Sequence, residues 1–388
     1  MFIDYKSIGE INMYEVINKY IDKLMTSEPD KPLWNIEVIR QGKKPAWNYI
    51  DGCMISSLIQ MYKTTKNEKY IEFVKKYVDY YVKEDGSILG YDIKKHSTDD
   101  ICESRVLFDL YDITKNEKYN KAIEYTFNQI KEQPRTKEGN FWHKEIYPNQ
   151  VWLDGLYMAQ PFYTRYMTLR GKKVYQDIVN QFKNVFEIMY DKKDHLYYHA
   201  YDSERKLFWA DKKTGLSKNY WLRAIGWYTV ALVDVLDFMD EQLYDEYNTI
   251  KEIFKKTVDG ILEYQDKDSK MFWQVVNYPN KKGNYLETSG SSMIAYALLK
   301  GARLNVLPER YSKIGVEIFN GICNKYLTVN KDGDLNLGGI CLVAGLGPEN
   351  NLRRDGSYEY YISEPVVEND AKGVGPFIMA YTEMMQLK

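Results

Sequence analysis

Cysteine is scarce in this sequence, and charge of neither sign is in excess. The 388 residues contain four cysteines and no Cys-x-x-Cys pair. This scarcity argues against a disulfide framework and against a thiolate zinc site, so we expect the cysteines to act as small buried apolar residues: Cys53, Cys102, Cys323 and Cys341. The 53 basic and 55 acidic side chains nearly cancel. Because nucleic-acid binding depends on many Lys and Arg contacts with phosphates, we predict no nucleic-acid partner.

Long hydrophobic runs and linkers are also missing. No stretch approaches the roughly eighteen uncharged residues that a membrane span needs. Residues 1–6 contain no basic segment that leads into an apolar run, so we predict no membrane association and a cytoplasmic location. No Pro-, Gly- or Ser-rich linker marks a boundary, and we therefore expect one domain over residues 1–388. The sequence leaves the oligomeric state open.

What the sequence does have is a repeat of about fifty residues, a period typical of stacked supersecondary units. Residues 51–62 and 100–111 each begin with a carboxylate and continue as an apolar helical stretch, and the same Thr-Lys-Asn-Glu-Lys-Tyr follows each of them, ending at Tyr70 and Tyr119. The pattern predicts six inner helices, near residues 51–62, 100–111, 154–166, 221–236, 287–304 and 372–385. More polar amphipathic stretches predict six outer helices, near residues 12–27, 68–83, 117–132, 173–189, 243–264 and 308–326.

Six helix pairs indicate an all-α protein, a closed (α/α)6 barrel, because an open stack would need polar capping repeats at both ends. Closure requires that the last inner helix packs on the first. Glycine costs about 1 kcal/mol inside a helix, so we expect close packing or ligand approach at five inner-helix glycines: Gly52, Gly155, Gly226, Gly290 and Gly375. Every inner helix begins at the same end of the ring, and we expect the functional mouth there.

Aromatic residues make up 15% of the chain, and such side chains can stack on sugar rings while hydrogen-bonding to hydroxyls. The densest chemistry lies in residues 141–158, where Asp154 stands at a predicted helix start near Trp152 and Tyr157. Asp154 is either a helix cap or a general acid whose pKa is raised by these aromatic neighbours. A second carboxylate, Asp99 or Asp100, opens the preceding inner helix.

Several other polar and aromatic residues are open to two interpretations, a functional one and a structural one. Trp47, Tyr49 and Trp227 either line a sugar site or pack at the inner wall of the ring. His195 and His199 are four residues apart, but on an extended segment they would lie about 13 Å apart and could not share an ion. We therefore expect no metal and no cofactor.

Six motifs give the chain a family resemblance, and they occur in order over most of its length: residues 141–144, 152–158, 198–202, 221–228, 286–291 and 369–375. Together they resemble the unsaturated rhamnogalacturonyl hydrolases of glycoside hydrolase family 105. The resemblance implies the same (α/α)6 barrel. It also implies an oligosaccharide substrate that carries a 4,5-unsaturated uronic acid at its non-reducing end, as a polysaccharide lyase leaves behind.

By this resemblance Asp154 is the general acid and base, and Asp99 matches the second aspartate of the family better than Asp100. Asp154 would protonate C4 of the double bond, and water would add to C5. The resemblance further implies that Arg223 and Lys144 face the substrate carboxylate and that His199 lies near the reacting sugar. Other residues of the matching motifs are expected to bind the substrate as well: Trp152, His143 and Trp227, with Trp47 and Tyr49 from the neighbouring helix start.

The expected substrate is an unsaturated rhamnogalacturonan disaccharide from pectin, with unsaturated glucuronyl units from glycosaminoglycan or ulvan fragments as the near alternative. A sugar 2-epimerase on the same toroid would need paired histidines, and a non-catalytic helical scaffold would lack convergent acids. The chain departs from the family pattern at Cys102-Glu103-Ser104 and in the glycine-rich loop 338–361 with Arg353 and Arg354. Such a loop often shapes the leaving-group side.

Overall fold

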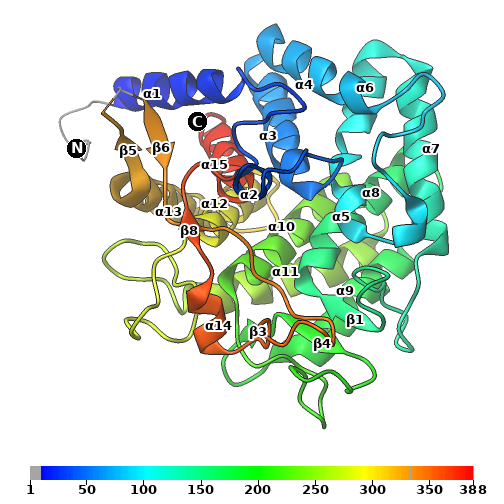
Figure 1. Ribbon diagram of the computed structural model, residues 1–388, viewed down its shortest axis with the longest axis vertical. Coiled ribbons are helices and arrows are strands. Elements are labelled where there is room, and N and C mark those ends of the chain that lie inside the picture. The colour runs from blue at the N-terminus through cyan, green and yellow to red at the C-terminus, as the bar shows by residue number, and fades with distance from the viewer. Residues whose placement is uncertain (1–9, 332–333, 388) are drawn as a thin grey trace.

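Six inner helices form a closed ring in the computed structural model, which describes residues 10–331 and 334–387. They follow one another around the ring, and the last packs on the first (Figure 1): α3 Tyr49–Thr65, α5 Thr98–Glu103 continued by α6 Val106–Thr114, α8 Leu153–Leu169, α10 Leu222–Phe238, α12 Thr288–Arg303 and α15 Ala371–Met384. The Thr382 hydroxyl contacts Met61 Sδ at 3.1 Å across the closing seam. The predicted (α/α)6 barrel is confirmed.

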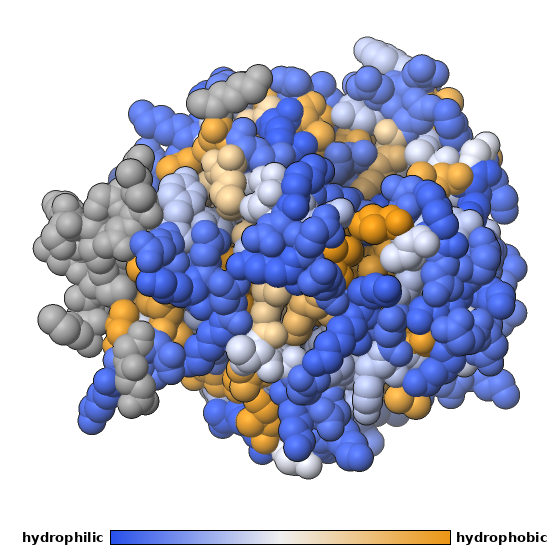
Figure 2. Space-filling view, turned by 90° about the horizontal axis from the view of Figure 1, so that it is seen from above, coloured by the Kyte–Doolittle hydropathy of each residue, from blue (hydrophilic) through white to orange (hydrophobic). Residues whose placement is uncertain are grey.

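The outer helices lie where the amphipathic stretches predicted them: α1 Glu10–Leu24, α4 Glu68–Tyr81, α7 Glu117–Glu132, α9 Gln176–Met189, α11 Tyr244–Leu262 and α13 Arg310–Tyr326. Helix α1 lies beside α15 (Figure 1), and the Tyr381 hydroxyl donates to the Tyr14 carbonyl at 3.3 Å. The face in Figure 2 is mostly hydrophilic with hydrophobic residues scattered between, as polar outer helix faces require.

The inner-helix glycines mark points where helices touch. A Cβ on Gly375 would come within 2.7 Å of the Cys53 carbonyl, at the seam between α15 and α3. A Cβ on Gly226 would come within 2.8 Å of Met293 Sδ and 3.3 Å of the Cα of Gly290, where α10 meets α12. Close packing therefore offsets the helix cost of these glycines, as predicted.

The second inner helix is not continuous, which corrects the prediction of one helix over residues 100–111. A turn at Ser104 and Arg105 separates α5 from α6, and its bonds span three residues, as from the Ser104 amide to the Ile101 carbonyl. The Arg105 guanidinium donates from this turn to the Tyr157 carbonyl on α8 at 2.6 Å. This contact fixes the break against the next inner helix.

Short elements complete the mouth end of the ring: α2 Ile36–Gln41, the 3-10 helix η1 Ile93–Lys95, and α14 Tyr358–Ser363. Four antiparallel strand pairs are present in the described residues: β1 Gln150–Trp152 with β4 Ala200–Asp202, β2 Tyr190–Asp191 with β3 Leu196–Tyr197, β5 Leu327–Val329 with β6 Leu335–Leu337, and β7 Ile340–Cys341 with β8 Val366–Val367. Of these, β1 and β4 position the candidate site. The four cysteines are buried and unpaired, as expected. Within the described ranges, no helix is both long and apolar enough to cross a membrane.

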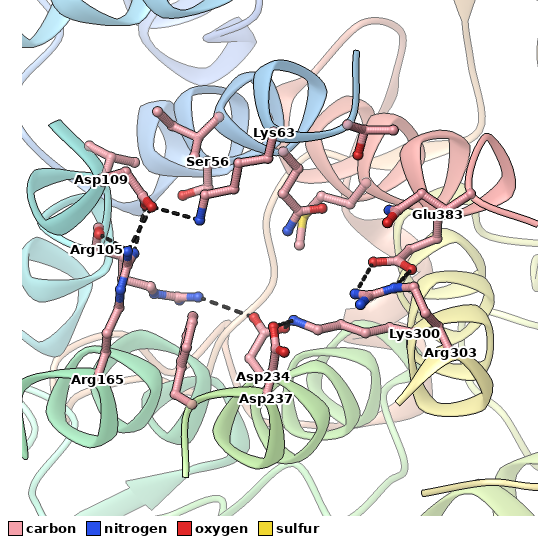
Figure 3. A pocket seen from close by; sticks show the side chains of 17 residues that line it. Ser56, Lys63, Arg105, Asp109, Arg165, Asp234, Asp237, Lys300, Arg303 and Glu383 are labelled. Carbon is pink, nitrogen blue, oxygen red and sulfur yellow. Dashed lines mark hydrogen bonds and ion pairs between the residues drawn. The ribbon is translucent and has the colours of Figure 1, made fainter. Parts of the chain in front are cut away.

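The end of the ring opposite the inner-helix starts holds a cavity of about 280 Å³ lined by charged side chains (Figure 3). Lys300 Nζ lies 2.8 Å from Asp234 and from Asp237, and Arg105 lies 3.7 Å from Asp234. Three further ion pairs complete this charged floor: Arg165 with Asp109, Lys63 with Asp109, and Arg303 with Glu383. The floor ties the C-terminal halves of the inner helices together.

Candidate active site

Asp154 lies in the first turn of α8, at the mouth end of the ring, and it does not cap the helix. The N-cap position belongs to Trp152, whose side chain makes no capping bond. The Asp154 side chain is nearly buried, with 11% of its surface exposed. The capping interpretation of Asp154 is therefore wrong, although the positive end of the helix dipole still favours a carboxylate here.

The pairing of β1 with β4 brings His199 to Asp154. Trp152 is the register partner of Ala200, and the Leu153 amide donates to the His199 carbonyl at 3.1 Å. His199 Nε2 then lies 3.1 Å from Asp154 Oδ2. The two atoms are not aligned for a hydrogen bond, and neither has another hydrogen-bond partner in the described part of the chain. This leaves a buried acceptor and a buried ring nitrogen side by side.

The other ring nitrogen of His199 is held by Tyr361, a residue that the sequence analysis missed. His199 Nδ1 and the Tyr361 hydroxyl are 2.7 Å apart. Burial raises the pKa of Tyr361 far above its usual value, so the phenol keeps its proton. A hydroxyl that donates to Nδ1 fixes the imidazole proton on Nε2, the side that faces Asp154.

The charge state of Asp154 differs from the expectation. Burial acts to raise the pKa of Asp154, but the close approach of His199, with a smaller contribution from His143, outweighs burial and lowers the pKa below its usual value. Desolvation by aromatic neighbours was predicted to raise it. The prediction failed because it omitted the histidine that β4 brings alongside.

Asp99 forms a second centre together with Lys144 and His143. Lys144 Nζ donates to Asp99 Oδ2, and His143 Nε2 lies 3.7 Å from Asp99 Oδ1. Burial lowers the pKa of His143 to about 4 despite the pull of Asp99, so this imidazole is neutral near neutral pH. Its Nδ1 lies 3.1 Å from the Thr98 hydroxyl. The structure thus places His143 beside Asp99, and the charge of Lys144 is already balanced.

Asp100 does not join the centre formed by Asp99, Lys144 and His143. It lines a cavity of about 420 Å³ together with Trp47 and Lys144. Burial, followed by repulsion from Asp99, raises the pKa of Asp100 to about 7. The Trp47 indole is buried and donates to the Asp100 carbonyl at 3.1 Å. In this arrangement Trp47 joins α3 to α5.

Trp152 connects the two centres. Its ring stacks on His143 at 4.5 Å with an interplanar angle of 17°, and it meets His199 edge-on at 5.4 Å. Trp227 lies deeper, stacked on Tyr157 at 4.3 Å, and Tyr49 meets it edge-on at 6.4 Å. Trp152 is therefore the aromatic residue in contact with both histidines.

Arg223 is buried and engaged by protein groups. Its guanidinium donates to the Ser289 hydroxyl at 2.7 Å and to the carbonyls of Cys341 and Leu342, and it lies 3.7 Å from Glu287. Only 1% of Arg223 is exposed. Its assignment as a ligand of the substrate carboxylate stays a prediction, and one that would require these partners to be released.

The segment between β7 and α14 covers the mouth. It crosses this end of the ring toward β4, in orange in Figure 1. Gly345 lies against the Trp152 ring, Leu346 is fully buried, and the Trp209 indole donates to the Gly347 carbonyl at 3.0 Å. The loop 338–361, which the sequence analysis associated with the leaving-group side, therefore packs against the candidate site at Trp152.

His195 and His199 are the two histidines whose spacing in the sequence raised the possibility of a metal site. In the structure they have different surroundings. His195 is half exposed and lies 2.8 Å from Glu263, whereas His199 is fully buried beside Asp154. In the described residues no group of three or more His, Cys, Asp or Glu side chains is arranged to hold a metal ion.

The comparisons with known proteins agree with one another. The family model described as Glycosyl Hydrolase Family 88 matches residues 16–388. The chain is similar to Protein Atu3128 of Agrobacterium fabrum, with 37% identity over 236 residues that cover 59% of this chain and 99% of the relative. It is also similar to the unsaturated rhamnogalacturonyl hydrolase YesR of Bacillus subtilis, with 27% identity over 266 residues, 67% of this chain and 72% of the relative. A solved glycoside hydrolase from family 105 of C. acetobutylicum superposes with a TM-score of 0.86 at 41% identity, covering 95% of this chain and all of the other.

Proposed function

We propose a reaction for this chain from one premise: it belongs to Glycosyl Hydrolase Family 88 and is a glycoside hydrolase of the unsaturated glycuronyl type found in family 105. The proposed reaction releases the 4,5-unsaturated uronic acid from the non-reducing end of a lyase-generated oligosaccharide. The default substrate is the unsaturated rhamnogalacturonan disaccharide, because the curated relative YesR carries that activity in its name. We further propose that it acts on pectin fragments in the cytoplasm, with which its four unpaired buried cysteines are compatible.

The observation that supports this reaction most strongly is the contact between Asp154 and His199 at the mouth, with Oδ2 and Nε2 3.1 Å apart and unsatisfied by other groups. In the proposed mechanism Asp154 gives a proton to C4 of the C4=C5 bond. The resulting carboxylate takes a proton from water as the water oxygen bonds to C5. The C5 hemiketal then opens by breaking its bond to the ring oxygen, and the leaving sugar departs from C1.

Because its pKa is lowered, Asp154 is ionised in the free protein, and it must gain a proton before it can act as the acid. A bound uronate brings a negative charge next to Asp154, and a nearby like charge raises the pKa of a carboxyl. In the proposal Asp154 takes up this proton from solvent as the substrate binds, and the Nε2–H of His199, 3.1 Å away, stabilises the carboxylate that remains once C4 is protonated. Asp99, balanced by Lys144, is the proposed second carboxylate, and Trp152 and His143 are proposed to hold the sugar between the two centres.

The test is turnover of lyase-generated pectin oligosaccharides, followed by the loss of ultraviolet absorbance of the conjugated double bond. We expect the wild-type protein to act on these oligosaccharides and not on saturated ones. Asp154→Asn should lower kcat about 10²–10⁴-fold while the protein stays folded, because this is the range that a positioned acid contributes. Asp211→Asn, in an exposed turn, is the control and should turn over normally. Near-normal rates for Asp154→Asn would refute the assignment.

The alternative substrates are separated by the same assay. Unsaturated glucuronyl fragments of glycosaminoglycan or ulvan, offered in parallel, would replace the rhamnogalacturonan disaccharide as the substrate if their kcat/KM were higher. The sugar 2-epimerase alternative is disfavoured by the family to which the chain belongs, although His143 and His199 both contact Trp152. Epimerisation without loss of the double bond would favour it.

A further inference from the structure

The proposed substrate carries a carboxylate, and the mouth needs a cation that is free to bind it. The two cations that the sequence suggested are both engaged. Arg223 is buried among Ser289, Glu287 and the carbonyls of the β7 segment, and Lys144 is paired with Asp99. Binding the substrate through either one would leave a buried carboxylate unpaired, which is costly.

Arg354, in contrast to Arg223 and Lys144, is a cation that no protein group engages in the described residues. Its guanidinium has no hydrogen-bond or ion-pair partner among the residues that the structure describes, although the side chain is half-buried. It lies close enough to Tyr360 to oppose the rise that burial causes in the pKa of that phenol. A guanidinium without a protein partner is free to bind an anion, and its planar group can hold a carboxylate through two hydrogen bonds.

The position of Arg354 places a bound anion at the mouth. Gly345 lies between Arg354 and Trp152, because a Cβ built on Gly345 would be 3.1 Å from the Trp152 ring and 3.4 Å from Arg354 Nη1. Trp152 also stacks on His143 and makes a T-shaped contact with His199, the neighbour of Asp154. Arg354 and the Asp154 centre therefore lie around the same indole ring.

A tight turn holds Arg354 in this orientation. The Gly347 amide donates to the Arg354 carbonyl at 2.9 Å, and a Cβ on Gly347 would come within 2.2 Å of the Asn351 carbonyl, so only glycine fits. The adjacent Arg353 is turned away and pairs with Glu364 at 2.7 Å. Of the two arginines in the loop, only Arg354 is directed toward Trp152.

We propose that Arg354 binds the carboxylate of the unsaturated uronic acid and so determines the requirement for an acidic sugar; this rests on the proposed function above. A planar guanidinium can grip a carboxylate with two parallel hydrogen bonds, which fixes the orientation of the sugar as well as its position. The carboxylate is attached to C5, the atom that water attacks. Arg354 thus positions the reacting bond over the Asp154 centre from the segment that covers the mouth.

The experiment uses the unsaturated disaccharide with a neutral rhamnose leaving group, so that the substrate holds a single carboxylate, and the methyl ester of the same disaccharide. Wild type, Arg354→Gln, Arg354→Lys and Lys218→Gln are compared on both. Lys218 is the charge-matched control, because its exposed pair with Asp355, at 3.1 Å, contributes little to stability. Circular dichroism and Tm establish that each variant is folded.

We expect Arg354→Gln to raise KM for the acid about tenfold to hundredfold, the size expected for a hydrogen-bonded charge, while its KM for the ester stays within about threefold of wild type. Arg354→Lys should recover part of the loss, and Lys218→Gln should match wild type on both substrates. An unchanged KM for the acid in Arg354→Gln, or equal losses on acid and ester, would overturn the assignment of Arg354 alone. A wild-type protein inactive on both substrates would overturn the proposed function, and this assignment with it.

Discussion

Replacement of Lys300 by Met, in the charged floor of the ring, should lower the stability of the protein. The Lys300 side chain is 5% exposed, and its ammonium group lies 2.8 Å from both Asp234 and Asp237. Met keeps most of the apolar stem and removes the charge. Two carboxylates of the floor then lose a cation, and one of them, Asp234, is buried with 7% of its side chain exposed.

The loss in the free energy of unfolding depends on the partners that Asp234 keeps when Lys300 is replaced. Breaking a buried ion pair by removing one partner costs about 3–5 kcal/mol. We expect about 3 kcal/mol, the lower end of that range, because Arg105 stays 3.7 Å from Asp234 and the Tyr296 hydroxyl still donates to it. Unfolding entropy is about 2.1 cal/mol/K per residue, or about 0.8 kcal/mol/K for 388 residues, so Tm should fall by about 4 °C.

Lys63→Met is the matched control in the same cavity. Lys63 is half exposed, and its partner Asp109 keeps Arg165 at 2.6 Å. We expect a loss of less than about 1 kcal/mol for this exposed pair. Thermal unfolding followed by circular dichroism measures both variants, and kcat below Tm should equal that of wild type in each. Equal Tm values for the two variants would refute the claim that burial of Lys300 makes its ion pairs important for stability.

Two further predictions concern the site and the seam. The pKa of His143 falls from 6.5 in the unfolded chain to about 4 in the fold, so the unfolded state binds the extra proton first and stability declines as pH falls from about 6.5 to about 4, by about 3 kcal/mol in all. His143→Gln should flatten that part of the pH dependence of unfolding in urea, and an unchanged slope would contradict the buried neutral imidazole. Gly375→Ala gains about 1 kcal/mol of helix propensity but drives a methyl group into the Cys53 carbonyl, so we expect a net loss of about 1–2 kcal/mol. A raised Tm would mean that α15 does not press on α3 at this point.

The sequence alone was enough to predict the ring. A local apolar periodicity predicts each inner and outer helix. This periodicity depends only on which face of the helix is buried. The repeat made the order of helices predictable, and five glycines indicated where inner helices approach closely. Asp154 was found because its motif is contiguous, with Trp152 and Tyr157 only two and three residues away.

The sequence did not reveal which charges are already paired at the mouth, because pairing depends on distances between residues far apart in the chain. β-pairing of residues 150–152 with 200–202 brings His199 to Asp154, and this contact reversed the predicted direction of the Asp154 pKa shift. The break between α5 and α6 was likewise missed. The fold engages Arg223 with Glu287 and leaves Arg354 unpaired beside Trp152, although both arginines look equally available in the sequence. Periodicity specifies the buried face of a helix, whereas the free energy of a charge depends on every group around it, and only the folded chain determines those neighbours.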